Sequence, residues 1–368
     1  MEKKMLCVTN VELDDPGGRS HALRSRLKFL DKHDWEVEFF VLKHYHESIS
    51  KLWRFRNRVV RDIRFVWSMN NPFTLHLPPL FLKKIGINFI WVAEFRDPIY
   101  LNPDPKKLKS IYKVVDMEVI KRADCLVVPK GMQADLIDYS KEYGINLDKF
   151  FSLPFAGIND EKCSDISYSS TPPFTITYAG SFYKGWIEPL TFLDGFRRFV
   201  NESNLTPENV QVKFFGDWRE EYWAKVKEFG LERYVRVMGW VRRPELGVHL
   251  RRSHLFLHIA GSSASNRKNV SYKFWDYLCH AKPILALCGG DFTIKDIILK
   301  NNFGYVADYD DPKDIAQKLS QAYSDFESEK ANKIIRKLIR NRKKFSRYHH
   351  DDTFAQICDA VYMASKVI

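Results

Sequence analysis

The chain has 368 residues, a length that exceeds one ordinary hydrophobic core and predicts two domains. Apolar residues make up 45% of the chain and charged residues 28%, a balance that excludes a disordered protein. The formal net charge of +12 favours an anionic partner, such as nucleic acid, a membrane surface or a phosphorylated substrate, unless it serves solubility alone.

The sequence also lacks the signals of a membrane or secreted protein. No stretch approaches the roughly 18 apolar residues of a membrane-spanning helix. The first ten residues lead into a strand pattern without the apolar region of a signal peptide. The cysteines are scattered and none has Cys-x-x-Cys spacing, so we expect reduced, mostly buried thiols in a cytoplasmic protein. They are Cys7, Cys125, Cys163, Cys279, Cys288 and Cys358.

The first half of the chain alternates short apolar runs with amphipathic segments. Helices are expected at residues 21–32 and 106–123, and the second segment places Ile111, Val115 and Val119 on one helix face. Strands are expected at residues 5–9, 37–42, 63–67, 89–94, 125–128 and 150–153.

The alternation is interrupted once and then restarts. Residues 162–173 (KCSDISYSSTPP) are polar, rich in serine and end in two prolines, a composition typical of a linker. Such alternation predicts parallel sheets covered by helices, hence an α/β fold with two Rossmann-like domains. In the second half, strands are expected at 175–179, 210–215, 235–238, 255–259, 283–287 and 305–307, and helices at 187–200, 219–228, 244–252, 270–280 and 312–326.

The segment at residues 270–287 (VSYKFWDYLCHAKPILAL) carries the most chemistry. As a helix it places Lys273, Asp276, Tyr277 and His280 on one face, and its N-terminus would aim free N–H groups at an anion. The carboxylate of Asp276 can accept hydrogen bonds from two ribose hydroxyls. An ordinary helix with an exposed Lys273–Asp276 ion pair explains the pattern about equally well.

Two glycines follow the first expected strand. Gly17 and Gly18 allow close approach of the backbone to a ligand, or they form a plain tight turn. His21 comes one turn later, where it either contacts phosphate or sugar or is a surface histidine. A Gly-x-Gly-x-x-Gly motif is absent here, which argues against a nicotinamide or flavin cofactor.

Arg96 and Asp97 follow the strand expected at 89–94 and precede Pro98. A charged pair at the carboxyl end of a strand is well placed for a ligand cleft. Asp97 would orient an acceptor hydroxyl there, and the plain alternative is a turn residue before proline.

Residues 47–64 (ESISKLWRFRNRVVRDIR) hold six basic and two acidic residues. A single helix would suit an anionic membrane surface, or it would pack its apolar face on the sheet with the cations in solvent. Nucleic-acid binding is not expected, because no stacking platform is evident. The predicted apolar stripe is Ile49, Leu52, Trp53, Val59, Val60 and Ile63, with Lys51, Arg54, Arg58 and Arg61 opposite.

Taken in chain order, these stretches resemble the family 4 glycosyltransferases. The Lys-x-x-acid-Tyr pattern before a Lys-Pro-hydrophobic strand looks like the nucleotide-sugar-binding helix of that family. ITYAGSFYKG at 176–185 resembles the glycine-rich turn that opens the second domain, and VKFFG and VRVMGWV resemble the next two strands. In the first half, DPGGRS at 15–20 and EFRDP at 94–98 match family loops.

Two positions depart from the family pattern. Many members carry Glu-x7-Glu in the donor helix, but here Lys268 takes the first position and Asp276 the second. Ser181 stands where the family often has an arginine. Arg267, Lys268 and Lys273 are the local candidates for the second cation beside the donor diphosphate.

The resemblance implies a GT-B fold, with two facing Rossmann-like domains at residues 1–165 and 166–345 and an interdomain cleft. The C-terminal helix, in residues 346–368, would pack back on the first domain. Implied nucleotide-sugar contacts are Gly17, Gly18, Gly180, Ser181, Lys184, Lys273, Asp276 and Tyr277; implied acceptor-side residues are His21, Arg96 and Asp97. Lys184 and Lys273 would neutralise the diphosphate, and Asp97 and Lys184 are the catalytic candidates.

The implied activity is sugar transfer, with retention, from a nucleotide-sugar to an acceptor hydroxyl. The acceptor would be a sugar, with lipid-linked sugars and polysaccharides as candidates, and the enzyme would be peripheral at the inner face of the cell membrane. We expect no metal, no cofactor besides the nucleotide-sugar co-substrate, and no nucleic-acid partner. Two alternatives remain open, a non-catalytic nucleotide-sugar-binding or partner subunit and a nucleotide-sugar epimerase.

Overall fold

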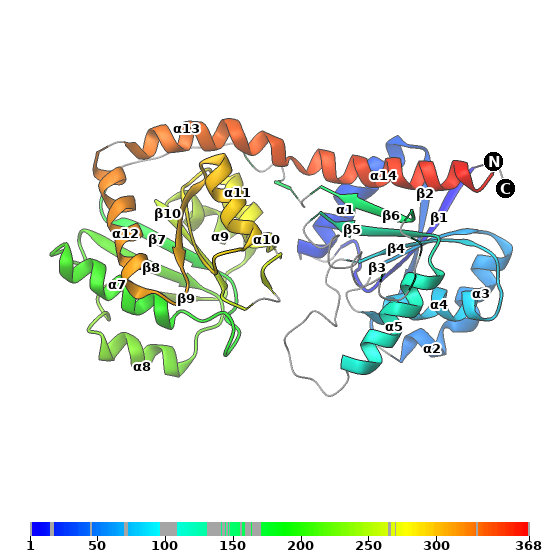
Figure 1. Cartoon of the computed structure of the whole chain (residues 1–368), viewed down its shortest axis with the longest axis horizontal. Helices are drawn as coiled ribbons and strands as arrows, with labels where there is room; N and C mark the ends of the chain where they lie inside the picture. Colours follow the sequence, from blue (N-terminus) through cyan, green and yellow to red (C-terminus); the bar gives the residue numbers. More distant parts are fainter. Residues whose placement is uncertain are drawn as a thin grey trace. The chain divides into compact units, whose positions relative to one another are not determined.

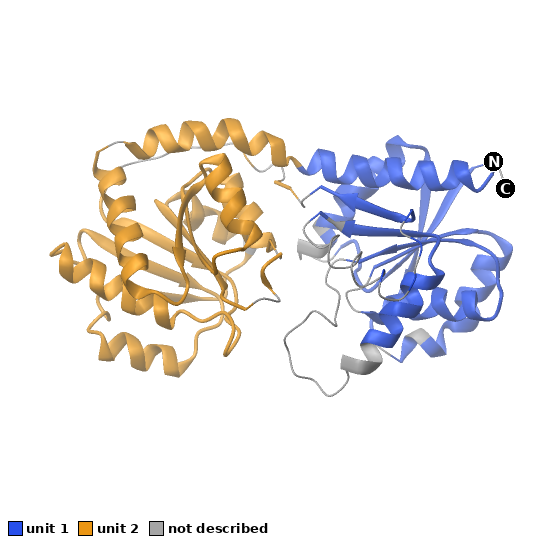
Figure 2. Cartoon of the chain, viewed as in Figure 1, with its two compact units in different colours: residues 1–156, 347–368 blue, residues 157–346 orange. Residues whose placement is uncertain are grey.

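The computed structural model divides the chain into two compact units, which we describe separately (Figures 1 and 2). Unit 1 comprises residues 1–156 and 347–368, and unit 2 comprises residues 157–346. The boundary between the domains predicted from the sequence lay between residues 165 and 166. The described residues are 2–14, 18–44, 46–69, 73–95, 109–130, 141, 144, 146, 148–154, 157–158, 163, 171–263, 266–268, 270–328 and 330–366.

Unit 1 contains a six-stranded parallel sheet in the order β2-β1-β3-β4-β5-β6. Each strand overlaps a run that the sequence predicted. The strands are β1 (Lys3–Thr9), β2 (Trp35–Val41), β3 (Phe65–Met69), β4 (Ile90–Glu94), β5 (Cys125–Pro129) and β6 (Phe150–Leu153).

The helices of unit 1 cover this sheet, and α14, from the far end of the chain, lies against α1. They are α1 (Gly18–Lys32), α2 (Glu47–Ser50), α3 (Leu52–Arg61), η1 (Phe73–His76), α4 (Leu77–Lys84), α5 (Lys109–Arg122) and α14 (Arg347–Ala364). Apolar side chains from β1, β3, β4 and β5 form the core, because strands covered on both faces are buried along their whole length.

Unit 2 repeats the plan with the sheet order β12-β11-β10-β7-β8-β9, again all parallel. The six predicted strands are confirmed as β7 (Phe174–Ala179), β8 (Val210–Phe215), β9 (Val235–Gly239), β10 (Leu255–Gly261), β11 (Ile284–Cys288) and β12 (Gly304–Asp308). The helices are α7 (Leu190–Glu202), α8 (Glu220–Glu228), α9 (Arg243–Arg251), α10 (Tyr272–Cys279), α11 (Thr293–Asn301), α12 (Pro312–Glu327) and α13 (Lys330–Arg342), followed by η5 (Lys343–Phe345).

The strand order of unit 2 reverses between β7 and β10. From β7 the chain proceeds outward to β8 and β9, and from β10 it proceeds in the opposite direction to β11 and β12. The loops after β7 and β10 therefore leave on opposite faces of the sheet. A crevice between such loops is the usual ligand position in an open α/β sheet, so the site belongs at the carboxyl ends of β7 and β10.

The prediction of one amphipathic helix at residues 47–64 is wrong. Two helices, α2 and α3, meet at Lys51. The buried face of α3 is Phe55 and Val59, whereas Trp53 of the predicted stripe is 67% exposed. The periodicity was misassigned because Phe55, which packs on Phe40, was left out of the stripe. Ile49 and Val60 are likewise exposed.

The cations of this segment are also less free than predicted. Lys51 pairs with Glu47 at 3.1 Å, and Arg58 forms an ion pair with Glu38 of β2. Arg54 and Arg61 remain exposed. Two of the four cations predicted opposite the stripe are therefore engaged in ion pairs within the fold.

The cysteine prediction is confirmed in its main point. The six cysteines are outside disulfide bonds, and five of them are buried; Cys163 is half-buried. Burial raises the pKa of Cys288 to about 12, so this thiol stays protonated and unreactive at neutral pH. Across the described part of the chain, no helix combines the length and apolar character needed to cross a bilayer.

Candidate functional site

The carboxyl ends of β7 and β8 form a backbone cradle. Gly180 directly follows β7 with φ of +148°, a conformation that favours glycine. A Cβ atom there would lie 2.8 Å from Nζ of Lys273. A Cβ on Gly216, which follows β8, would lie 2.5 Å from the carbonyl oxygen of Gly180. The two glycines thus allow strand ends and a cation to approach more closely than any side chain would permit.

Lys273 supplies that cation. Its Nζ donates a hydrogen bond to the Tyr178 hydroxyl at 2.7 Å and lies 4.3 Å from the centre of that ring. Among the described residues, no carboxylate comes within salt-bridge distance of Lys273. Burial lowers the pKa of Lys273 from 10.5 to about 8, since nothing negative compensates the desolvated ammonium. A bound anion would provide that compensation.

Helix α10 presents its N-terminus at the same place. Ser271 is the N-cap residue, with an extended backbone and no side-chain capping bond. Its hydroxyl lies 3.0 Å from Nε2 of His258, a buried side chain of β10. Burial lowers the pKa of His258 to about 3, so the ring is neutral and adds no charge beside Lys273. The positive end of the α10 dipole therefore lies next to one cation, Lys273, in the first turn of the helix.

Asp276 and Tyr277 differ in their surroundings. Asp276 is half-buried on α10. Tyr277 is 1% exposed, stacks on Phe256, and its hydroxyl oxygen accepts the N–H of Ala179 at 2.8 Å. This contact holds the end of β7 in place, so Tyr277 acts on the cradle through the backbone instead of facing a ligand.

The two other predicted residues of the glycine-rich turn also have clear positions. The carbonyl oxygen of Ser181 accepts a hydrogen bond from the Tyr178 hydroxyl at 2.9 Å. The Lys184 side chain is 68% exposed, and its Nζ lies 3.2 Å from Oε2 of Glu221 on α8. This pairing lowers the pKa of Glu221. Lys184 points outward to α8, whereas Lys273 is the cation at Gly180.

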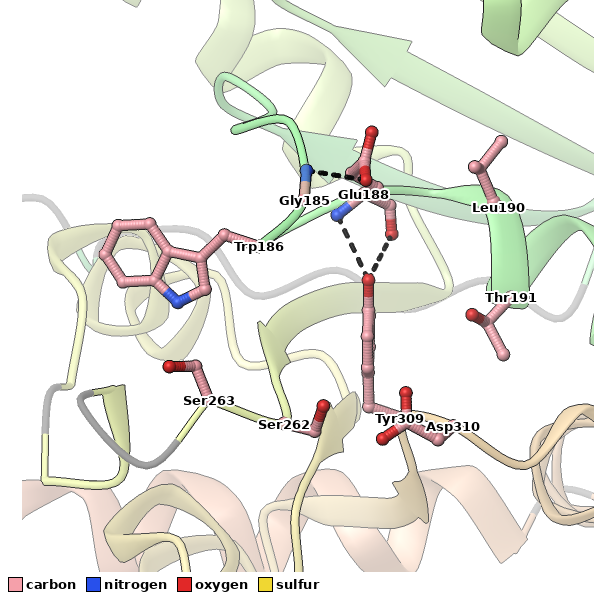
Figure 3. Close-up of a pocket in the computed structure, with 9 residues that line it drawn as sticks. All are labelled: Gly185, Trp186, Glu188, Leu190, Thr191, Ser262, Ser263, Tyr309 and Asp310. Carbon is pink, nitrogen blue, oxygen red and sulfur yellow. Dashed lines mark hydrogen bonds between the residues drawn. The ribbon is translucent and has the colours of Figure 1, made fainter. Parts of the chain in front are cut away.

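A pocket of about 370 Å³ opens beside the cradle, between the loops that follow β7, β10 and β12 (Figure 3). The Glu188 carboxylate accepts the N–H of Gly185 at 2.8 Å and the Tyr222 hydroxyl at 3.1 Å. Hydroxyls, carboxylates and the flat face of an indole are the groups that bind sugars. The lining residues are Gly185, Trp186, Glu188, Leu190, Thr191, Ser262, Ser263, Tyr309 and Asp310.

The backbone of this loop is also tightly constrained. A Cβ on Gly261, the last residue of β10, would lie 2.5 Å from the carbonyl oxygen of Trp186. The indole Nε1 of Trp186 is buried and has no hydrogen-bond partner among the described residues. A buried N–H without a partner is costly, so a ligand acceptor in the pocket would be favourable.

Most candidates in unit 1 lie outside the described residues. Gly17, Arg96 and Asp97 belong to that set. Gly18 begins α1, and His21 is part of the same helix, but its side chain is not described. Within the described residues, no group of three or more His, Cys, Asp or Glu side chains could hold a metal ion.

Comparison with known proteins identifies the class of unit 2. Residues 173–325 match the family described as Glycosyl transferases group 1. Unit 2 is a group 1 glycosyltransferase domain. The match covers every strand of the unit 2 sheet, and it also includes the cradle, the pocket and Lys273. No curated protein matches the sequence significantly.

Solved structures extend the likeness to the whole chain. Sucrose-phosphate synthase from Thermosynechococcus elongatus has a TM-score of 0.71 at 12% identity, covering 98% of this chain and 100% of that chain. The α,α-trehalose 6-phosphate synthase from Burkholderia multivorans has a TM-score of 0.69 at 10% identity, with 99% of each chain covered. WaaG, a glycosyltransferase involved in lipopolysaccharide biosynthesis, has a TM-score of 0.63 at 12% identity, covering 96% and 99%. The predicted GT-B fold is confirmed.

Sequence reasoning missed three elements of the site. Tyr178 and His258 are buried residues inside strands, and only their distance from Lys273 and Ser271 in space gives them a role. The pocket was also missed, since its lining comes from three loops far apart in the sequence. Gly216 could have been identified from the sequence, because it ends a strand in a stretch that resembles the family.

Proposed function

We propose that this glycosyltransferase moves a sugar from a nucleotide-sugar donor to an acceptor hydroxyl. The observation that supports it is the Lys273 ammonium, desolvated and without a carboxylate, beside the Gly180 backbone and the N-terminus of α10. A diphosphate leaving group develops negative charge as the sugar departs. Fixed cations and N–H groups at that position stabilise it without reorganisation.

In this proposal each unit 2 residue has one role. Lys273 neutralises the diphosphate, and Asp276 binds the ribose hydroxyls. Gly180 and Ser181 leave room for the phosphates, and Lys184 adds a second cation once it leaves Glu221. The pocket beside Trp186 holds the sugar of the donor.

The acceptor side of the proposal rests on unit 1. Gly17 and Gly18 make room for the diphosphate, and His21 and Arg96 lie near the acceptor, whose hydroxyl Asp97 orients. Transfer proceeds with retention and without a metal, since lysines replace the cation. The donor sugar is a hexose, and the enzyme works in the cytoplasm at the inner face of the membrane on a lipid-linked or polysaccharide acceptor. Ile49 and Trp53, exposed beside Arg54, support this membrane contact.

The test is calorimetric titration of UDP and GDP, and of their sugar conjugates, into the wild type and Lys273→Gln. We expect the variant to lose about tenfold to a hundredfold in affinity for its cognate nucleotide, because a charge-assisted contact of about 1.5–3 kcal/mol is removed. Lys227→Gln, at an exposed lysine of α8, is the matched control. Equal affinity of all three proteins would refute the assignment.

A non-catalytic subunit would bind the nucleotide-sugar without hydrolysing or transferring it. That alternative is motivated by Lys268, which replaces the first glutamate of the family pattern. An epimerase would change the sugar without an acceptor. Product analysis by mass spectrometry and NMR, with and without added acceptor sugars, separates the three activities.

A further inference from the structure

Helix α13 and the turn after it form a segment with an uncompensated positive charge. Between residues 330 and 344 there are eight basic side chains and no acidic one, against a formal net charge of +12 for the whole chain. Figure 1 shows α13 along the outside of unit 2. The eight are Lys330, Lys333, Arg336, Lys337, Arg340, Arg342, Lys343 and Lys344.

Only one of these eight cations has a structural role in the fold. Arg342 is buried and donates to the carbonyl oxygens of Leu278 and Cys279, at 2.9 and 2.8 Å, so it caps the C-terminal end of α10. Ala331, Ile335 and Leu338 complete the buried stripe of α13. The helix therefore packs through one narrow face, and the other seven cations are left for solvent.

Those seven cations, which we call the α13 basic face, have no ion-pair partner in the described part of the chain. Six are exposed and Lys337 is half-buried. Lys333 and Lys337, and Arg336 and Arg340, stand four positions apart, where like charges destabilise a helix. On α7, by contrast, Arg197 pairs with Asp194 at 2.6 Å.

A row of unpaired cations that destabilises its own helix indicates an anionic partner outside the fold. We propose that the α13 basic face binds the anionic headgroups of a phospholipid membrane. This surface is separate from the membrane contact proposed for α2 and α3. It belongs to the other unit and acts through charge alone.

The shape and composition of the face favour a membrane over nucleic acid. The 13 residues of α13 form a helix roughly 20 Å long, which can lie flat on a planar charged surface. No aromatic side chain among residues 330–344 offers a platform for stacking bases. Large exposed apolar side chains are absent from the described residues of this segment, so binding is adsorption without insertion.

The experiment measures co-sedimentation of the full chain with vesicles of anionic phospholipid and of zwitterionic phospholipid. The test variant is Lys333→Gln, Arg336→Gln and Arg340→Gln together. The control removes the same charge from exposed cations elsewhere on unit 2, with Lys227→Gln, Arg251→Gln and Lys313→Gln. A third variant, Arg54→Gln with Arg61→Gln, measures how much the separate contact proposed for α3 contributes to vesicle binding.

We expect the wild type to co-sediment with anionic vesicles at low salt and to stay in the supernatant with zwitterionic vesicles. The partition coefficient of the test variant onto anionic vesicles should fall about a hundredfold, since three cations near an anionic surface act together. The control should lose less than about threefold, and salt should weaken binding in every case. Melting temperatures of the test and control variants should stay at or above that of the wild type, which shows that the fold is intact.

Three results would overturn the inference. Equal losses in test and control would mean that net charge alone acts, and equal binding to zwitterionic vesicles would exclude a charge mechanism. Tighter binding to duplex DNA than to anionic vesicles would assign the face to nucleic acid. Affinity for UDP and GDP should be unchanged in the test variant, so failure here is distinct from failure of the donor site.

Discussion

At the scale of single residues, the site depends on one desolvated lysine. Lys273 contacts Tyr178 and the backbone of Gly180, and burial brings its pKa to about 8. Sequence spacing identified Lys273 as a candidate but not its environment. That environment makes its charge sensitive to pH near the physiological range.

Nucleotide affinity should therefore depend on pH through Lys273. Below pH 8 the free ammonium is charged and attracts the diphosphate; above pH 8 it loses its proton and affinity falls, by up to about tenfold per pH unit. Calorimetric titration between pH 7 and pH 10 measures the fall. Lys273→Arg stays charged throughout this range, so its affinity should be flat with pH. A wild-type profile as flat as that of the arginine variant would contradict the prediction.

The pocket beside the cradle should distinguish a nucleotide-sugar from the bare nucleotide. We expect Trp186→Ala to lower the affinity for the cognate nucleotide-sugar about tenfold or more. The affinity for the nucleoside diphosphate should be almost unchanged, because only the sugar would contact the indole. Parallel titrations of both ligands give the ratio. Leu299→Ala, an exposed apolar residue of α11, is the control. Equal weakening of both ligands by Trp186→Ala would place the sugar elsewhere.

At the scale of elements, a buried ionic network joins α1, β4 and α14. Nη1 of Arg26 lies 2.6 Å from Oε2 of Glu94, and its Nε lies 3.4 Å from Oδ1 of Asp351. Arginine cannot accept a hydrogen bond, so the 2.7 Å contact with Nε2 of His350 requires a neutral ring protonated on Nδ1, which donates to the carbonyl oxygen of Pro154. The network attaches the C-terminal helix to the strand that leads to Arg96 and Asp97.

Removing Arg26 should destabilise unit 1 strongly. Arg26→Met removes the buried ion pair with Glu94, whereas Asp351 keeps Arg347 at 3.0 Å; we expect a cost of about 3–5 kcal/mol of unfolding free energy. Urea unfolding followed by circular dichroism measures this. Lys28→Met, an exposed neighbour on α1, should change stability by less than about 0.5 kcal/mol. Comparable effects of both changes would show that the network is not what holds α14.

At the scale of the whole molecule, the donor residues and the acceptor candidates belong to different units. Asp97→Asn should therefore cut turnover at least a hundredfold while nucleotide affinity stays within about twofold of the wild type, because general-base or orienting groups act on the reacting atoms. Initial rates and calorimetry on the same preparation give both values. Loss of nucleotide affinity would instead assign Asp97 to the donor side.

Local periodicity was enough to predict the two sheets. The twelve strands of the described residues were all predicted, because a strand buried on both faces is a short apolar run such as Cys125–Pro129, whatever its neighbours are. Periodicity failed on the helices that pack through one narrow face. Helix α13 was missed, and the buried face predicted for α3 included Val59 correctly but Trp53 and Val60 wrongly.

The sequence by itself determined the α/β class, the strands, the glycines and the lysine of the donor helix, since these depend on residues close together in the chain. Only the tertiary structure decided the strand order and its reversal between β7 and β10. It also set Lys273 against Gly180 and Tyr178, paired Lys184 with Glu221, and turned Tyr277 into the core. Those contacts join residues 37 to 98 positions apart, and packing between elements, which no local pattern encodes, brings them together.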